Sequence, residues 1–379
     1  MITQCPIAPG SSFTYNFTVS NQSGSYWYHS HTKGQYMDGM KSVMVIEDPK
    51  FPFEYDKEEV FELAEWYHKD IDALTKTFMS VYNPTGAEPI PQNWILNNTM
   101  NLTWNVEPDT TYLLRFINTG GFVSQYVWLE DHDFEVVEVD GVYVEPYKAS
   151  MLYITVAQRY TVLLKTKSST NKNYAIMQKF DDSMLDVVPS DLVLNRTSYM
   201  MYNNGSKPEE NIVDELDFLD DFNLVPYGDY KEEMLGEPNQ RITLDVSMNN
   251  LKNGINYAFF NNITFTQPKV PTLLSVLSSG NESTDPRVYG SNTHAFVLEK
   301  DEIIEIVLNN LDTGTHPFHL HGHVFQVIER DVAREDTQSP LTYDPKGNYT
   351  YPKYPMKRDT LYVRPQSNFV IRFKADNPG

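Results

Sequence analysis

Histidine is concentrated in two short stretches that lie far apart in the chain, and the fold must accommodate both. Residues 316–323 read HPFHLHGH and hold four of the nine histidines. Residues 26–31 read YWYHSH and hold two more. In an extended segment, side chains two positions apart project to one face, so each His-x-His pair presents two imidazoles together. His316 lies an odd number of steps from His319 and would point elsewhere.

These pairs predict a multinuclear metal site that lies between domains. Neutral imidazole suits copper, zinc and iron. A single four-coordinate zinc site needs fewer ligands and usually draws on Cys or carboxylate as well. The alternative, that the histidines are satisfied core or surface groups, is the simpler interpretation of one isolated pair. Four histidines packed around Pro, Phe and Gly count against it, and one strand could then serve two metal centres.

The rest of the chain has the pattern of short β-strands separated by turns. Residues 11–19 read SSFTYNFTV and alternate apolar with polar side chains, which is typical of a half-buried strand. Frequent turn signals, such as Asp140-Gly141, favour an all-β sandwich or barrel. One helix is predicted around residues 70–81. Further strands are predicted at 42–46, 111–117, 160–166, 241–248, 302–310, 359–363 and 368–373.

Composition excludes some partners and leaves others open. The net charge of −21 argues against nucleic acid, because binding phosphate needs Lys and Arg. An acidic surface can concentrate cations, or it can simply keep a glycoprotein soluble; both interpretations stand. Cys5 is the only cysteine, so there is no intrachain disulfide framework. We expect Cys5 to be a small buried apolar group.

The compartment is indicated by glycosylation signals. Their number predicts a secreted chain that carries N-glycans. No apolar run approaches the ~18 residues of a membrane span, and no signal peptide is visible. Because the sequence starts almost directly in a predicted strand, we expect a fragment of a longer protein. The acceptors are Asn16, Asn21, Asn97, Asn101, Asn195, Asn204, Asn262, Asn281 and Asn348.

Both histidine motifs resemble those of the multicopper oxidases, most closely the fungal cell-surface ferroxidases that work with an iron permease. The resemblance covers nearly the whole chain. It includes GAEPIPQ at 86–92, FDDSMLD at 180–186 and YAFFNNIT at 257–264. It implies an all-β fold of three tandem cupredoxin-like Greek-key domains, with the first and third incomplete.

The division into domains follows from the same resemblance and from the composition of the chain. The acidic segment 206–238 is rich in Gly and Pro, and we interpret it as a connector, although a long surface loop of the second domain would look the same. The predicted boundaries are 1–57 for the end of domain 1, 58–205 for domain 2, 206–238 for the connector and 239–379 for domain 3.

The resemblance also implies a cofactor, namely four copper ions. In such enzymes a type 1 copper takes electrons singly from the substrate. A type 2 copper and a type 3 pair reduce O2 to water. By analogy His316 is a type 1 ligand and His319 binds the type 2 copper. His29, His31 and His321 bind the type 3 pair.

The ligand set found in this chain is partial. The family uses eight histidines for the three-copper cluster, and four of them are matched here. Cys5 lacks flanking histidines, so it does not match the family's type 1 cysteine. His323 shares a face with His319 but does not match a ligand position. His68, His132 and His294 have no partners in sequence, and we expect them to be structural or surface groups.

Substrate choice in the family depends on carboxylates near the type 1 copper. Glu88, Asp186 and Asp312 match the positions that bind Fe(II) in the fungal ferroxidases. Anionic oxygen ligands suit a hard cation and favour Fe(III) over Fe(II), which makes the iron a better reductant. Asp181 and Asp182 are candidates for an outer carboxylate on the path of the iron. Taken singly, each acid would be interpreted as an exposed loop residue; the joint match favours a site.

The expected function is therefore a ferroxidase that couples oxidation of Fe(II) to four-electron reduction of O2 and serves iron uptake together with an iron permease. The expected location is the cell surface, with a plasma-membrane anchor outside this chain. Two alternatives remain: a laccase-type phenol oxidase, and a non-catalytic glycoprotein that keeps the fold. Fe(II) against Cu(I), and plasma against internal membrane, stay open.

Overall fold

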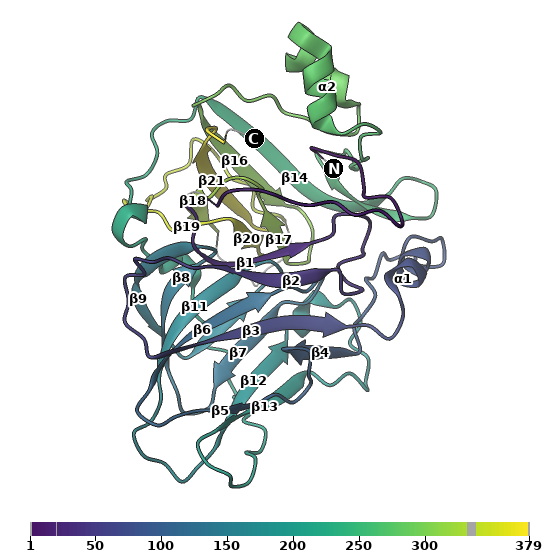
Figure 1. Cartoon of the computed structure of the whole chain (residues 1–379). Helices are drawn as coiled ribbons and strands as arrows, with labels where there is room; N and C mark the ends of the chain where they lie inside the picture. The colour runs from purple at the N-terminus through teal and green to yellow at the C-terminus, as the bar shows by residue number, and fades with distance from the viewer. Residues whose placement is uncertain (1, 20, 332–338, 378–379) are drawn as a thin grey trace.

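The computed structural model describes residues 2–19, 21–331 and 339–377, and β-strands dominate it (Figure 1). The strands of these residues form five sheets: one of five strands, two of six, and two ribbons of two strands each. Most neighbouring strands are antiparallel. The parallel pairs are β3 (Lys57–Trp66) with β6 (Thr111–Asn118), β13 (Asn195–Met201) with β5 (Thr103–Asn105), and β14 (Gln240–Asn250) with β16 (Ile303–Asn310). The predicted all-β class is confirmed.

Two of the larger sheets form a sandwich in the middle of the sequence. One has the strand order β4-β3-β6-β11-β8-β9 and the other has the order β10-β7-β12-β13-β5. Their strands are β3 (Lys57–Trp66), β4 (Asn93–Leu96), β5 (Thr103–Asn105), β6 (Thr111–Asn118), β7 (Gln125–Leu129), β8 (Phe134–Val139), β9 (Val142–Ala149), β10 (Met151–Ile154), β11 (Arg159–Lys165), β12 (Tyr174–Phe180) and β13 (Asn195–Met201).

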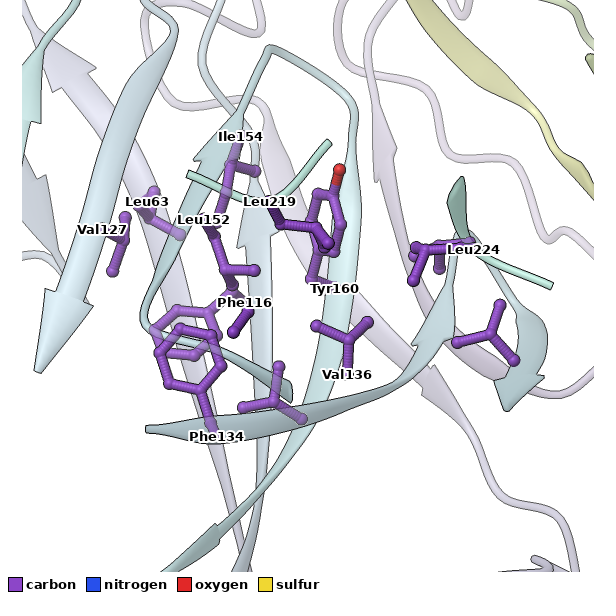
Figure 2. Packing of buried hydrophobic residues seen from close by; sticks show 14 of the residues in the cluster. Leu63, Phe116, Val127, Phe134, Val136, Leu152, Ile154, Tyr160, Leu219 and Leu224 are labelled. Atoms are coloured by element: carbon purple, nitrogen blue, oxygen red, sulfur yellow. The ribbon is translucent and has the colours of Figure 1, made fainter. Parts of the chain in front are cut away.

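Apolar side chains from both sheets fill the sandwich. Phe116 on β6 and Phe134 on β8 lie with Leu152 of β10 in the core that Figure 2 shows. β6 runs through the middle of its sheet, and seven of its eight residues are buried. A strand buried on both faces carries an almost continuous apolar run, which explains the sequence TYLLRFIN.

The third large sheet lies above the sandwich in Figure 1 and has the order β15-β14-β16-β21-β18-β19. The two ribbons are β1 with β2, which pairs Gly24 with Ile46, and β17 with β20, which pairs His316 with Val363. The bounds are β1 (Gly24–His29), β2 (Lys41–Ile46), β14 (Gln240–Asn250), β15 (Asn256–Phe260), β16 (Ile303–Asn310), β17 (His316–His319), β18 (Phe325–Arg330), β19 (Lys357–Arg358), β20 (Thr360–Val363) and β21 (Asn368–Lys374).

Helices are few and short. The predicted helix is present as α1 (Ile71–Phe78), where the Asp70 side chain accepts a hydrogen bond from the Ala73 amide and caps the first turn. The second α-helix is α2 (Thr272–Ser279), and no residue of either helix is buried. The 3-10 turns are η1 (Asp182–Met184), η2 (Asp221–Asn223), η3 (Gly228–Tyr230), η4 (Gly280–Thr284) and η5 (Pro286–Tyr289).

No helix in the described parts of the chain has the length and apolar character needed to cross a membrane.

Two local predictions near the N-terminus are wrong. Residues 11–19 form no strand, and Phe13, Tyr15 and Phe17 are exposed. An alternating pattern forms a strand only when a partner strand pairs with it, and none does so within the described residues. Cys5 is exposed rather than buried, because it lies in the same irregular segment.

The segment 206–238 is irregular, but it is packed closely. Leu219 and Leu224 are buried in the core, and the backbone of Leu219 bonds to Met151 on β10. Further along, the Met234 amide donates to the Lys353 carbonyl, 3.0 Å away. The segment thus makes hydrogen bonds on the sandwich and on the part of the chain that follows β18.

Candidate metal centre

The two ribbons bring the two histidine pairs into one row of imidazoles. The ring centroids of His29 and His31 lie 4.5 Å apart, and those of His319 and His321 lie 4.8 Å apart. The two pairs meet at His31 and His321, whose ring centroids lie 5.0 Å apart. Side chains separated by most of the sequence therefore meet at one place.

Local structure explains how each pair is presented. His29 is the last residue of β1 and His319 is the last residue of β17. The second member of each pair, His31 or His321, lies just beyond the end of its strand. Each ribbon therefore ends in two imidazoles, one fixed by strand pairing and one supplied by the turn that follows.

In His29 and His319, the two histidines at the strand ends, hydrogen bonds show which ring nitrogen carries the proton. Nδ1 of His29 lies 3.1 Å from the Ser30 carbonyl oxygen. Nδ1 of His319 lies 3.0 Å from the Asp359 carbonyl oxygen and 3.0 Å from Oγ1 of Thr360. A carbonyl only accepts, so Nδ1 carries the proton in both rings and Nε2 keeps its lone pair. This is the arrangement of a metal-binding imidazole.

The donor set fits copper in its chemistry. Four imidazoles lie together, and neutral imidazole is a good copper ligand. Partial burial and the neighbouring rings lower the pKa of His321 to about 4, which keeps that imidazole neutral near pH 7. Among the described residues, however, no group of three or more His, Cys, Asp or Glu side chains is already arranged to hold a metal ion.

Aromatic rings line the same row, and sequence reasoning assigned them no role. Trp27 stacks on His29 with centroids 4.2 Å apart, and Tyr36 lies 4.9 Å from His29. Asp359 and Thr360 were missed as well, because only the register of β20 opposite β17 places them beside His319. The aromatic run at 26–28 was the one available signal for Trp27.

His316 lies apart from this row, as its odd spacing from His319 predicts. Its Nε2 is 2.9 Å from Oδ2 of Asp312, which leaves Nδ1 for a metal. The same oxygen of Asp312 accepts from the Gly314 amide at 3.0 Å. The pKa of Asp312 lies below its usual value, and the main cause is the hydrogen bond from His316. The pair is half-buried and fixed in a tight turn.

Glu88 belongs to the electrostatic neighbourhood of His316. Burial raises the pKa of Glu88; Asp186 and Asp312 raise it further, and His316 lowers it. These acids come from three separate segments of the chain. Glu88 is half-buried, whereas Asp186 is exposed. The arrangement therefore places Asp186, Asp312 and His316 within electrostatic reach of Glu88.

The loop that carries Glu88 is docked against the third large sheet. Nδ2 of Asn256, on β15, donates to the Pro84 carbonyl oxygen at 2.6 Å. Gly86 has φ +77°, and a Cβ there would lie 2.9 Å from the Asn256 side chain, so both conformation and space require glycine. Asn83 adds a brace from inside the loop by donating to the Ala87 carbonyl.

The remaining candidates have structural explanations. Asp181 is buried, accepts from Tyr153 at 2.6 Å and caps η1, whereas Asp182 is half-buried. The role of these two acids as outer carboxylates stays a prediction. His132 is buried and bonds to the Glu130 carbonyl and to Tyr202, so it is a structural histidine as expected. His323 packs on an aromatic ring, as does His294, and His68 is exposed.

Comparison with known proteins agrees with this geometry. Sequence profiles described as multicopper oxidase match residues 1–50, 57–205 and 265–379. The chain belongs to the multicopper oxidase family. Its fold is that of the cupredoxin-like domains of these proteins.

Single relatives and solved structures show which members of the family the chain resembles. The chain is 66% identical to the iron transport multicopper oxidase FET3 of Saccharomyces cerevisiae, and the match covers 100% of this chain and 60% of the relative. A solved structure of Fet3p, described as a multicopper oxidase that functions in iron import, superposes with a TM-score of 0.97 and is covered to 72%. A laccase from Botrytis aclada is 25% identical, with a TM-score of 0.80, and is covered to 70%. The chain spans about 60% of the length of the curated relatives it matches.

Proposed function

We propose that this chain forms the iron-binding side and half of the oxygen-reducing site of a copper-dependent ferroxidase. The observation that carries the proposal is the contact between Asp312 and His316, together with the electrostatic grouping of Glu88 and Asp186 around it. Relatives that are 65–66% identical are named iron transport multicopper oxidases, which supports the same substrate. The cofactor would be four copper ions, with O2 as co-substrate.

The residues have separate tasks in this proposal. Copper, when bound, supplies one-electron acceptance at His316 and four-electron reduction of O2 to water at a cluster that includes His29, His31, His319 and His321. Glu88, Asp186 and Asp312 bind Fe(II). Their negative charge stabilises Fe(III) more than Fe(II), because the product carries the greater positive charge.

Asp312 has a second task, which is orientation. By accepting a hydrogen bond from Nε2 it fixes the plane of the His316 ring, as carboxylates do for metal-bound histidines. The 2.9 Å contact also gives the electron a short bonded route from an iron ligand to the imidazole. Loss of Asp312 therefore affects both the binding of iron and the geometry of His316.

The test is the double variant Glu88→Ala/Asp312→Ala in protein expressed from the complete gene. We expect kcat/KM for Fe(II) to fall by roughly tenfold to a thousandfold, because loss of charged ligands costs a few kcal/mol in the transition state. Activity on a bulky aromatic amine should survive or rise, since that substrate uses neither charge. Copper content is measured alongside.

Asp191→Ala is the matched control, because Asp191 is an exposed acid close in sequence to Asp186. It should leave both activities unchanged. If the two activities of the double variant fall in parallel at full copper loading, the acids support the copper site rather than select iron. That outcome would favour the laccase-type alternative.

The partner, the location and the domain division belong to the same proposal. An iron permease would take up the Fe(III) product, and the protein would act at the cell surface, anchored to the plasma membrane. Eight of the nine glycan acceptors are exposed, and Asn195 is half-buried, which supports N-glycosylation. We keep the boundaries 1–57, 58–205, 206–238 and 239–379. A mass shift on treatment of the secreted protein with an endoglycosidase tests the glycans.

A further inference from the structure

We propose that Arg159 is a positioning residue: it sets the spacing between the two histidine pairs and, through Asp359 and Thr360, holds His319 in one tautomer. The inference rests on the proposed function, in which both pairs bind copper. Arg159 belongs to β11 in the middle sandwich, far in sequence from either pair. Its guanidinium stays protonated and has no acceptor atom, so it has no ligand role of its own.

The contacts of Arg159 reach both histidine ribbons. Its Nε donates to the Ser25 carbonyl on β1 at 2.8 Å. Its Nη1 and Nη2 donate to the two carboxylate oxygens of Asp359 at 2.6 and 2.7 Å. The guanidinium also lies over the ring of Tyr26, 5.1 Å from its centroid. Only 2% of Arg159 is exposed, so these contacts replace water almost completely.

This geometry matters because the two ribbons are separate sheets. Ser25 precedes His29 by four residues on β1, and Asp359 directly precedes Thr360, the residue that pairs with His319. A planar guanidinium that makes a two-pronged bond has little freedom to rotate or shift. One rigid group therefore fixes a point on the first ribbon relative to a point on the second.

The same chain of contacts decides which nitrogen of His319 is protonated. The Thr360 hydroxyl donates its only proton to Oδ1 of Asp359, 2.8 Å away. Toward His319, this hydroxyl can therefore only accept, and the Asp359 carbonyl also only accepts. Nδ1 must supply the proton, and Nε2 remains as the ligand nitrogen. Arg159 holds the carboxylate that orients the hydroxyl.

Arg372 provides a control for the alternative explanation, in which Arg159 only stabilises the fold. Arg372 on β21 is also buried, donates to one carboxylate, that of Glu305, and donates to two backbone carbonyls at 2.9 Å. It contacts neither histidine ribbon in the described structure. A lysine at either position would keep the charge but lose the two-pronged or fork geometry. If Arg159 only stabilises the fold, the two lysine variants should behave alike.

The experiment compares Arg159→Lys with Arg372→Lys in protein expressed from the complete gene. Both variants should unfold at lower denaturant concentration than the wild type. Only Arg159→Lys should lower copper affinity, by about tenfold to a hundredfold, as the loss of partners of a metal-bound histidine does. It should also change the electron paramagnetic resonance spectrum of the bound copper. Equal copper affinity and identical spectra in the two variants would overturn the inference.

A second measurement needs no copper. In the metal-free protein, long-range proton–nitrogen NMR of the imidazoles should show His319 protonated at Nδ1, and Arg159→Lys should broaden or shift that signal while Arg372→Lys does not. A wild-type His319 protonated at Nε2 would refute the tautomer assignment. If Arg159→Lys does not fold, Asp359→Asn decides, because it breaks the ionic two-pronged bond to Arg159. Unchanged copper affinity and an unchanged His319 signal in that variant would refute the inference.

His319→Gln separates this inference from the proposed function. If His319→Gln keeps its full copper content and its wild-type spectrum, the histidine row is not a copper site, and the proposed function fails. If His319→Gln loses copper while Arg159→Lys matches Arg372→Lys in every measurement, the copper site stands and only the positioning role of Arg159 fails.

Discussion

The middle sandwich and the two histidine ribbons are both β-structure, but different forces hold them in place. Seven of the eight residues of β6 are buried in an apolar core, whereas no residue of β2 or β17 is buried. In the second ribbon only β20 is buried throughout, and its Leu361 and Val363 belong to the core. Polar contacts, such as those of Arg159 with Ser25 and Asp359, also position the ribbons.

This difference teaches where stability and chemistry are located. Apolar burial is strong but does not specify direction, so it supports a sheet without fixing a ring to a few tenths of an ångström. Hydrogen bonds and ion pairs are directional, and buried ones hold geometry closely. The apolar core therefore provides most of the free energy of folding, and the polar groups around it direct the imidazoles.

We expect the largest loss of unfolding free energy when a side chain in the sandwich core is truncated. Phe116→Ala should lower the free energy of unfolding by about 3–5 kcal/mol, because the side chain is fully buried and leaves a cavity. Tyr28→Ala, on ribbon β1, should change it by no more than about 0.5 kcal/mol, because 60% of Tyr28 is exposed. Urea denaturation followed by circular dichroism measures both; equal losses would abolish the distinction between the two regions.

A smaller loss is expected from the ionic network under the ribbons. Asp221, in the segment after the sandwich, is buried between Arg330 and Arg358. Asp221→Asn leaves two buried guanidinium groups less well paired and should cost about 3 kcal/mol, the lower end for a broken buried pair. The lower end applies because Arg330 keeps Asp220 and Arg358 keeps Asp140.

The same group predicts a dependence on pH. Burial alone would raise the pKa of Asp221, but Arg330 and Arg358 hold it below its ordinary value of 3.8. The unfolded chain therefore binds this proton first as the pH falls, so the contribution of Asp221 is complete above 3.8 and is lost below it. Denaturation at several pH values tests this, and a difference between wild type and Asp221→Asn that stays constant into acid would contradict it.

The sequence predicted strands correctly where the folded chain supplies a partner strand. The alternation at 241–248 and the apolar run at 111–117 both correspond to strands, β14 and β6. The pattern at 11–19 is just as clear, yet no strand forms there, because alternation reports only that one face could be buried. Whether another strand covers that face depends on residues far away in the sequence.

The candidate site shows the same limit. The spacing of the histidines predicted that His316 would lie apart from His319 and His321, and the structure agrees. The contacts that hold the rings, from Asp359 and Arg159, depend on the register of β20 and on how two ribbons sit on the sandwich. Spacing within one segment carries no information on either. The roles of the ligands and of Glu88, Asp186 and Asp312 remain predictions.

The smallest predicted effect concerns α1, the helix beside the Glu88 loop. It compares a helix that depends on a single capping hydrogen bond with the buried strand β6. α1 has no buried residue, so its stability depends on local contacts, and the Asp70 cap bonds to the Ala73 amide at 2.8 Å. Asp70→Ala should cost about 1 kcal/mol, which raises hydrogen exchange of the α1 amides by about fivefold. Exchange in β6 should not change, because the sandwich core does not depend on α1.

Mass spectrometry of peptides that cover 71–78 and 111–118 measures both regions in one sample. A matched increase in β6 would mean that the helix and the sandwich open together, and that the loop carrying Glu88 shares the stability of the core.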